Sequence, residues 1–213
     1  TTLETAMPYD AKYFDLATRG LPLPWPGQAA SGRMLYRHSP ADTLGEAYAY
    51  EPSLVLAINL AFATGRPLLL AGEPGCGKTS VARNIALFLD CAYYQHTLSS
   101  RSQADELLYT VDTLRRLNEA QARQRLRDEA HFTQPGVLWW ALAPASAARR
   151  GLPAGTRHAT AATPPPGHRP TGNAVVLIDE IDKCEPDVPN DLLEVLDARR
   201  FTVGGRPVQH EGV

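Results

Sequence analysis

The chain has 213 residues, of which 21 are basic and 23 acidic, and its net charge at pH 7 is −2. Apolar residues make up 44% of the sequence, as in globular proteins, and no apolar run reaches the 18 residues that a membrane-spanning helix needs. The balanced charge provides no basic field for nucleic acid. We therefore expect a soluble chain with neither nucleic acid nor a membrane as its partner.

The three cysteines, Cys76, Cys91 and Cys184, are odd in number and far apart. No Cys-x-x-Cys pair occurs, so the sequence supports neither a disulfide framework nor a thiolate zinc site. The six histidines show no metal-ligand spacing. Reduced thiols are typical of proteins inside the cell, and we expect a cytoplasmic protein.

The first boundary along the chain is predicted near residue 50. Prolines in the run LPLPWPG, residues 21–27, keep the backbone extended, so residues 1–49 are expected to form an irregular N-terminal strap. A helix should begin at Pro52, which can occupy a first helical turn, and end at Gly65 and Pro67. Its apolar face would consist of residues at helical spacing, namely Leu54, Val55, Ile58, Ala61 and Phe62.

The next segment predicts strands that alternate with helices. The apolar run PLLLA, residues 67–71, is expected to be a strand buried on both faces, and a helix should follow over residues 78–89. Residues 91–97 predict a second strand, and residues 99–130 predict mostly helix. In that last segment apolar residues recur at helical spacing, namely Leu107, Leu108, Val111, Leu114 and Leu117.

The composition changes after residue 131. No Asp or Glu occurs between His131 and Ile178, and residues 144–171 consist mainly of Ala, Pro, Gly and Thr. Such a segment buries too little apolar surface to offset its conformational entropy, so residues 144–171 are expected to be a flexible insertion. The pair Trp139-Trp140 would be either core residues, which is the commoner case, or a patch that faces a partner.

The end of the chain returns to regular structure. Residues 174–178, AVVLI, predict a third buried strand, and residues 187–197 predict a helix. Residues 201–209 predict a hairpin, because a Gly-Gly pair separates two short runs. The alternation indicates an α/β fold with a parallel sheet, and residues 50–213 would form one core domain. The leucines expected to face inward on the helix are Leu192, Leu193 and Leu196.

Residues 72–79, GEPGCGKT, fit the phosphate-binding pattern G-x-x-x-x-G-K-[ST] at every fixed position. Its glycines allow backbone N–H groups to turn toward phosphate oxygens, and the helix that follows presents the positive end of its dipole. Lys78 would reach the β- and γ-phosphates and the Thr79 hydroxyl would bind Mg²⁺, whereas the alternative is an ordinary glycine-rich turn. The residues expected to bind ATP or ADP here are Gly72, Glu73, Pro74, Gly75, Cys76, Gly77, Lys78, Thr79 and Ser80.

Two adjacent carboxylates follow the third predicted strand. Asp179 lies at its carboxyl end, where it can hold Mg²⁺ or a water bound to it. Glu180 should point in a different direction and could take a proton from an attacking water. A strand followed by Asp-Glu is common by itself, so this interpretation depends on the phosphate loop about a hundred residues upstream. Open α/β sheets bind ligands at the carboxyl ends of their strands.

The runs GEPGCGKT and VVLIDEIDK, followed by NDLLEVLDARRFTV, resemble the AAA+ ATPases and, within them, the MoxR-like group. The resemblance covers about residues 50–208. It implies a P-loop NTPase fold, a three-layer sandwich with a mostly parallel central sheet. It also implies a Mg²⁺-dependent ATPase that forms a homo-oligomeric ring, usually a hexamer, and remodels partner proteins as a chaperone. Lys78 and Glu180 would then be catalytic, with an arginine supplied by the neighbouring subunit.

The sequence differs from the family pattern at its C-terminal end. It stops before the strand that carries the first sensor residue, and the arginine finger, the second sensor and the helical lid would come later still. We expect an excerpt of a longer protein, since otherwise another segment must fill a gap in the sheet. The alternative function is a nucleotide-gated interaction module that binds ATP without hydrolysing it. A helicase, which needs nucleic acid, is disfavoured by the net charge of −2.

Overall fold

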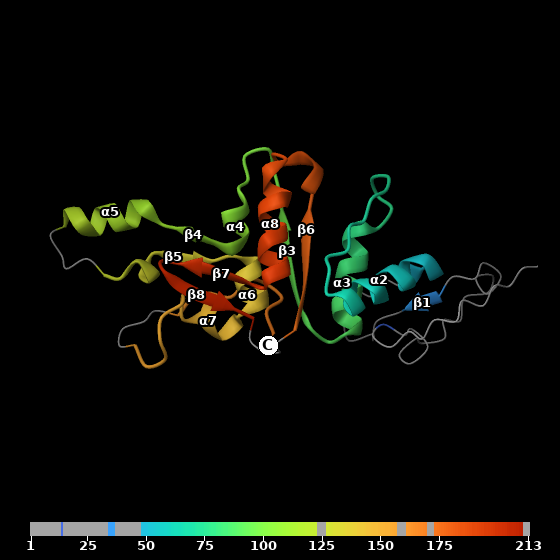
Figure 1. The fold of residues 1–213 in the computed structure, drawn as a ribbon, viewed down its shortest axis with the longest axis horizontal. Helices are drawn as coiled ribbons and strands as arrows, with labels where there is room; N and C mark the ends of the chain where they lie inside the picture. The colour runs from blue at the N-terminus through green and yellow to red at the C-terminus, as the bar shows by residue number, and fades with distance from the viewer. Residues whose placement is uncertain are drawn as a thin grey trace, which may run out of the picture. The chain divides into compact units, whose positions relative to one another are not determined.

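The chain divides into two compact units, residues 1–84 and 85–213, drawn in Figure 1. Most of the predicted N-terminal strap, residues 1–49, lies outside the described residues. The computed structural model describes residues 14, 34–36, 48–122, 127–156, 161–169 and 173–210.

The first unit contains a short hairpin and a helix whose ends follow the sequence signals. Strand β1 (Met34–Tyr36) pairs antiparallel with β2 (Tyr48–Tyr50), and α2 spans Pro52–Thr64. Pro52 lies in the first helical turn, and Gly65 ends the helix with a left-handed φ of 66°, as predicted. Phe62 is 42% exposed, so the buried face of α2 is narrower than its apolar pattern.

Two buried asparagines in the described part of this unit, Asn59 and Asn84, form hydrogen bonds with their neighbours. The Tyr50 ring is fully buried against Phe14, 5.2 Å between centroids, and its hydroxyl donates to Asn84 Oδ1 at 2.8 Å. Asn59 is also buried, and its amide both donates to the Phe14 carbonyl and accepts from the Phe14 N–H at 2.9 Å. Buried amides without such partners would destabilise the unit.

The prediction of a buried strand over residues 67–71 is wrong. These residues have no regular secondary structure, and Leu69 is 76% exposed. A strand requires a neighbour for its backbone N–H and C=O groups, and among the described residues no strand pairs with this segment. The helix that follows the loop, α3 (Lys78–Phe88), agrees with the prediction and buries its apolar face, formed by Val81, Ala82, Ile85 and Ala86.

The second unit is organised on a parallel strand pair. Strand β3 (Ala92–Thr97) pairs with β6 (Ala174–Asp179) from Ala92 opposite Ala174 to Thr97 opposite Asp179. The α/β character is therefore confirmed. The other strand pairs of the described residues are antiparallel, so a mostly parallel central sheet is not seen in that part of the chain. Strand β6 is half-buried rather than buried.

The prediction of a mostly helical segment over residues 99–130 is wrong in its middle. Strand β4 (Tyr109–Val111) pairs with β5 (Thr133–Pro135) and separates two short helices. Asp112 caps the second helix by accepting from Arg115 N at 2.9 Å. Leu114 and Leu117 are 73% and 53% exposed, because this helix has no buried face. The elements are α4 (Ala104–Leu108), β4 (Tyr109–Val111), α5 (Thr113–Gln121), the 3₁₀ helix η2 (Glu129–His131) and β5 (Thr133–Pro135).

The tryptophan pair belongs to the core. Trp139 and Trp140 lie on α6 (Val137–Leu142) and are at most 3% exposed. The Trp139 ring meets Tyr109 and Phe201 edge-on, and its indole N–H donates to Ser146 Oγ at 3.3 Å. The interpretation as a partner-facing patch is therefore wrong, and the core interpretation is confirmed.

The described parts of segment 144–171 pack more closely than the sequence predicts. Residues 144–148 form the short helix α7 (Pro144–Ala148), and the side chains of Ala147, Leu152 and Ala162 are buried. His168 Nδ1 lies 2.7 Å from the hydroxyl of Tyr94, whose pKa burial raises to about 12. Small side chains bury little surface each, but here they pack against aromatic rings already in the core.

The C-terminal helix and hairpin agree with the prediction in position. Helix α8 (Asp187–Ala198) lies beside β3 and β6 in Figure 1. Its residues Val188 and Leu192 are buried in the hydrophobic core. Leu193 is 48% exposed, so its predicted inward orientation is wrong. The hairpin strands are β7 (Arg200–Val203) and β8 (Arg206–Gln209), and Gly204 and Gly205 at the turn have φ of 53° and 76°.

An ion pair fixes the hairpin to the segment before η2 and predicts a pH dependence. Arg206 donates to both oxygens of Asp128, at 2.7 and 3.1 Å, and with the Ala130 N–H this holds the pKa of Asp128 at about 2, below its usual 3.8. The pair stabilises the folded state above pH 3.8, and this contribution is lost as the pH falls toward 2. Because the Asp128 side chain is 42% exposed, solvent screening limits the contribution to about 0.5–1 kcal/mol.

We expect Asp128→Asn to lower the free energy of unfolding at pH 7 by about 0.5–1 kcal/mol, and the thermal unfolding midpoint should fall accordingly. The difference between parent and variant should shrink as the pH is lowered from 5 toward 2, measured by circular dichroism. Asp105→Asn, which removes an exposed carboxylate without an ion pair among the described residues, is the control. A difference that stays constant over this pH range would contradict the assignment.

Candidate functional site

The phosphate loop of the first unit has the backbone shape that its glycines predict. A turn at Pro74–Gly75 leads to Lys78, the first residue of α3, and Val81 N donates to Gly77 O at 3.0 Å. Gly75 and Gly77 have φ of 80° and 90°, values that side chains with a Cβ rarely adopt. The loop therefore ends at the N-terminus of a helix of 11 residues, where backbone N–H groups favour an anion.

The side chain of Lys78 folds back onto the loop and bonds to its backbone. Its ammonium donates to the carbonyl oxygens of Gly72 at 2.8 Å and Glu73 at 2.9 Å, and Cys76 Sγ lies 3.7 Å away. The positive charge is thus held across the mouth of the loop by the loop's own backbone. Thr79 and Ser80 lie exposed in the first turn of α3, and the Cys76 thiol is also exposed.

A tyrosine that no sequence pattern predicted lies beside the loop. Tyr48, on β2, lies so close to Gly77 that a Cβ built there would be 3.1 Å from Tyr48 Cε2. Burial raises the pKa of Tyr48, and the neighbouring Cys76 and Glu51 add to this rise. No local pattern indicates such a contact, because Tyr48 and Gly77 are far apart in sequence and only the fold brings them together.

The acidic pair occupies the carboxyl end of the parallel strands in the second unit. Asp179 is the last residue of β6, and its carbonyl accepts from Leu98 N at 2.9 Å, which continues the pairing with β3. Asp179 Oδ1 accepts from the N–H of Glu180 at 3.1 Å. The carboxylate of Asp179 is therefore oriented by the backbone of the next residue.

Glu180 has a backbone conformation that is uncommon for a residue with a side chain. Its φ is 62°, in the left-handed region, and such residues are concentrated at functional sites. The 3₁₀ helix η3 (Ile181–Lys183) follows directly, and the Glu180 carboxylate forms an ion pair with Lys183. The left-handed φ at Glu180 separates the end of β6 from η3, and a side chain that points in a different direction from Asp179 stays a prediction.

The predicted site thus has two halves in different units. The structure brings the loop residues 72–80 together in the first unit and Asp179 with Glu180 in the second. A joint site that contains both halves stays a prediction, as do the individual roles of these residues.

One family model covers the sequence of both halves. The model of the AAA domain (dynein-related subfamily) matches residues 67–211, a range that contains both the phosphate loop and the acidic pair. The chain belongs to this AAA family. The AAA domain is a nucleotide-binding domain of ATPase type with the P-loop NTPase fold, which supports the expectation of an AAA+ ATPase. No curated protein and no solved structure matches the chain.

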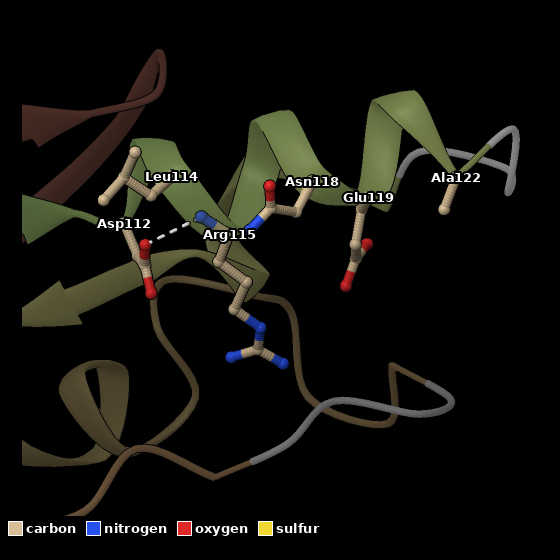
Figure 2. A pocket seen from close by; sticks show the side chains of 6 residues that line it. All are labelled: Asp112, Leu114, Arg115, Asn118, Glu119 and Ala122. Atoms are coloured by element: carbon tan, nitrogen blue, oxygen red, sulfur yellow. Dashed lines mark hydrogen bonds between the residues drawn. The ribbon is translucent and has the colours of Figure 1, made fainter.

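Two further findings concern the helices of the described residues. None of the helices in the described residues is long and apolar enough to span a membrane. A shallow groove runs along α5, as Figure 2 shows, but none of the residues that line it belongs to the predicted site. Its lining residues are Asp112, Leu114, Arg115, Asn118, Glu119 and Ala122.

Proposed function

We propose that this AAA domain binds ATP with Mg²⁺ and hydrolyses it. The observation that supports this most directly is the preformed loop, in which Lys78 bonds to two loop carbonyls at the N-terminus of α3. A cation and a set of backbone N–H groups around a curved loop are suited to bind a triphosphate. An ordinary glycine-rich turn would not require a lysine held across its mouth.

Each predicted residue has a role in this proposal. Lys78 and the loop N–H groups neutralise the β- and γ-phosphates, and Glu180 accepts the proton of the attacking water. Phosphoryl transfer depends on positioning and charge neutralisation, so an arginine from a neighbouring subunit would complete the site. The left-handed backbone at Glu180 supports a side chain that is aimed separately from Asp179.

Thr79 and Asp179 are the residues proposed to hold Mg²⁺. A hydroxyl and a carboxylate provide only oxygen donors, which fits a small hard cation that also binds substrate phosphates. Asp179 is oriented by the N–H of Glu180 at 3.1 Å, so its carboxylate is held at the strand end. When bound, the metal would neutralise phosphate charge.

The biological role that we propose is MoxR-like, a homo-oligomeric ring that remodels partner proteins as a chaperone. The acidic run at residues 179–183 and the hairpin after α8 support this assignment. All three cysteines are free thiols, which supports a reducing compartment such as the cytoplasm.

Calorimetric titration of the folded chain with ATP and Mg²⁺ tests the binding part of the proposal. We expect heat of binding and a rise in the thermal unfolding midpoint, since a ligand at 100 times its Kd stabilises the folded state by about 2.7 kcal/mol. AMP is the control, because it lacks the phosphates that Lys78 would contact. Neither heat nor a shifted midpoint with ATP would overturn the proposal.

A second candidate, the interaction module that binds ATP without hydrolysing it, is favoured by the ion pair between Glu180 and Lys183. The ion pair engages the carboxylate that would otherwise accept a proton from the attacking water. Steady-state ATPase assays with this chain and with the longest natural chain that carries it distinguish the two. Binding without turnover in both would favour the module.

A further inference from the structure

The contact between Tyr48 and Gly77 distinguishes the two glycines of the phosphate loop. Both have left-handed φ, but a Cβ at Gly75 would meet nothing within 4 Å. A Cβ at Gly77 would lie 3.1 Å from Tyr48 Cε2 and 3.8 Å from the hydroxyl oxygen. The edge of the Tyr48 ring therefore lies directly against the backbone at Gly77 and occupies the space of a missing side chain.

The ring is itself held in place by the core of the first unit. Tyr48 and Tyr50 meet edge-to-face at 4.8 Å between centroids, and Tyr50 is buried and bonded to Asn84 on α3. A hydrogen bond of Tyr50 therefore links β2 to α3, and the packing of Tyr48 against Gly77 links β2 to the phosphate loop. A ring edge that is fixed in this way limits the backbone rotations of the peptide at Gly77, because close-packed groups are displaced only at a cost in free energy.

Gly77 is the residue at which that limit has the largest effect. It directly precedes Lys78, and its carbonyl accepts the first α3 hydrogen bond, from Val81 at 3.0 Å. A glycine is free to leave its left-handed conformation, and rotation there would turn the loop N–H groups away from a phosphate. Held against Tyr48, the peptide retains the orientation from which N–H groups can donate to an oxyanion.

We propose that Tyr48 is a positioning residue that holds the phosphate loop in its anion-binding shape by packing against Gly77. The inference rests on the proposed function, since it assigns Tyr48 to the binding of the triphosphate part of ATP. The ring edge makes the contact, so the hydroxyl is not required. The nucleobase is not required either, because Gly77 belongs to the phosphate-binding part of the loop.

The test compares two ligands, MgATP and magnesium tripolyphosphate, which lacks base and ribose. Tyr48→Ala should weaken both about tenfold by calorimetry, and by the same factor, whereas Tyr48→Phe should stay within about twofold of the parent. Tyr93→Ala removes a half-buried tyrosine ring from the second unit and should leave both affinities unchanged. Titrations are run well below the unfolding midpoint of each variant, where a purely structural role would leave the affinities unaltered.

Two other outcomes overturn the inference. Unchanged affinities in Tyr48→Ala would show that the ring does not position the loop, and a loss confined to ATP would assign Tyr48 to the base or ribose instead. Should Tyr48→Ala fail to fold, Tyr48→Leu takes its place with the same expected outcomes. If the parent binds neither ligand, the proposed function itself fails, a result distinct from normal parent binding with an unaffected variant.

Discussion

Replacing Lys78 by alanine should abolish measurable ATP binding. The variant loses an ammonium that the loop carbonyls of Gly72 and Glu73 hold at 2.8 and 2.9 Å, and no other described side chain of the loop carries a positive charge. Hydrogen bonds to charged groups contribute about 1.5–3 kcal/mol each, so losing those to two phosphates should raise the Kd at least about 100-fold. Calorimetric titration with MgATP measures the change.

Arg83→Ala is the matched control for this experiment. Arg83 is an exposed cation on α3, outside the loop, so its removal changes the net charge equally and should leave the affinity within about twofold. The thermal unfolding midpoints of both variants check that the first unit remains folded. ATP affinity at the parent level in Lys78→Ala would refute the phosphate-binding role of the loop.

Replacing Glu180 by glutamine should preserve ATP binding and stop turnover. The amide keeps the size of the side chain but cannot accept the proton of an attacking water, and general base catalysis contributes about 10²–10⁴-fold to a rate. We expect kcat to fall by at least about 100-fold with Kd unchanged. The assay uses the longest natural chain that carries this sequence, because an arginine of a neighbouring subunit is part of the proposed site.

Asp182→Asn provides the comparison for Glu180→Gln. Asp182 is an exposed carboxylate two residues further along the chain, and its loss removes the same charge from the same turn. Hydrolysis at the parent rate in Glu180→Gln would reject its role as the base. A similar loss in both variants would instead point to the charge of the turn rather than to one proton acceptor.

Features set by local chemistry could be predicted from the sequence. Pro52 and Gly65 define the two ends of α2, and Gly204 with Gly205 defines the hairpin turn, because each depends on the φ that its own residue can adopt. The phosphate loop belongs to the same class. Its pattern encodes a backbone shape within eight residues, so the loop could be located before any packing was known.

Features that depend on distant partners could not be predicted in the same way. Residues 67–71 are apolar enough for a buried strand but have no neighbour among the described strands, and β4 interrupts a helical pattern because it pairs with β5. Leu152 and Ala162 are buried in a segment that composition alone marks as flexible. Tyr48 belongs to this group too, since only the fold places it against Gly77.

The register of β3 and β6 has a consequence for the acid at the end of the pair. The six matched positions run without a bulge from Ala92 opposite Ala174 to Thr97 opposite Asp179, a length of roughly 17 Å at about 3.3 Å per residue. Because side chains alternate between the two faces of a strand, a slip of one residue at the far end would turn Asp179 to the opposite face. The direction of this carboxylate therefore depends on the register of the whole strand pair as well as on its immediate neighbours.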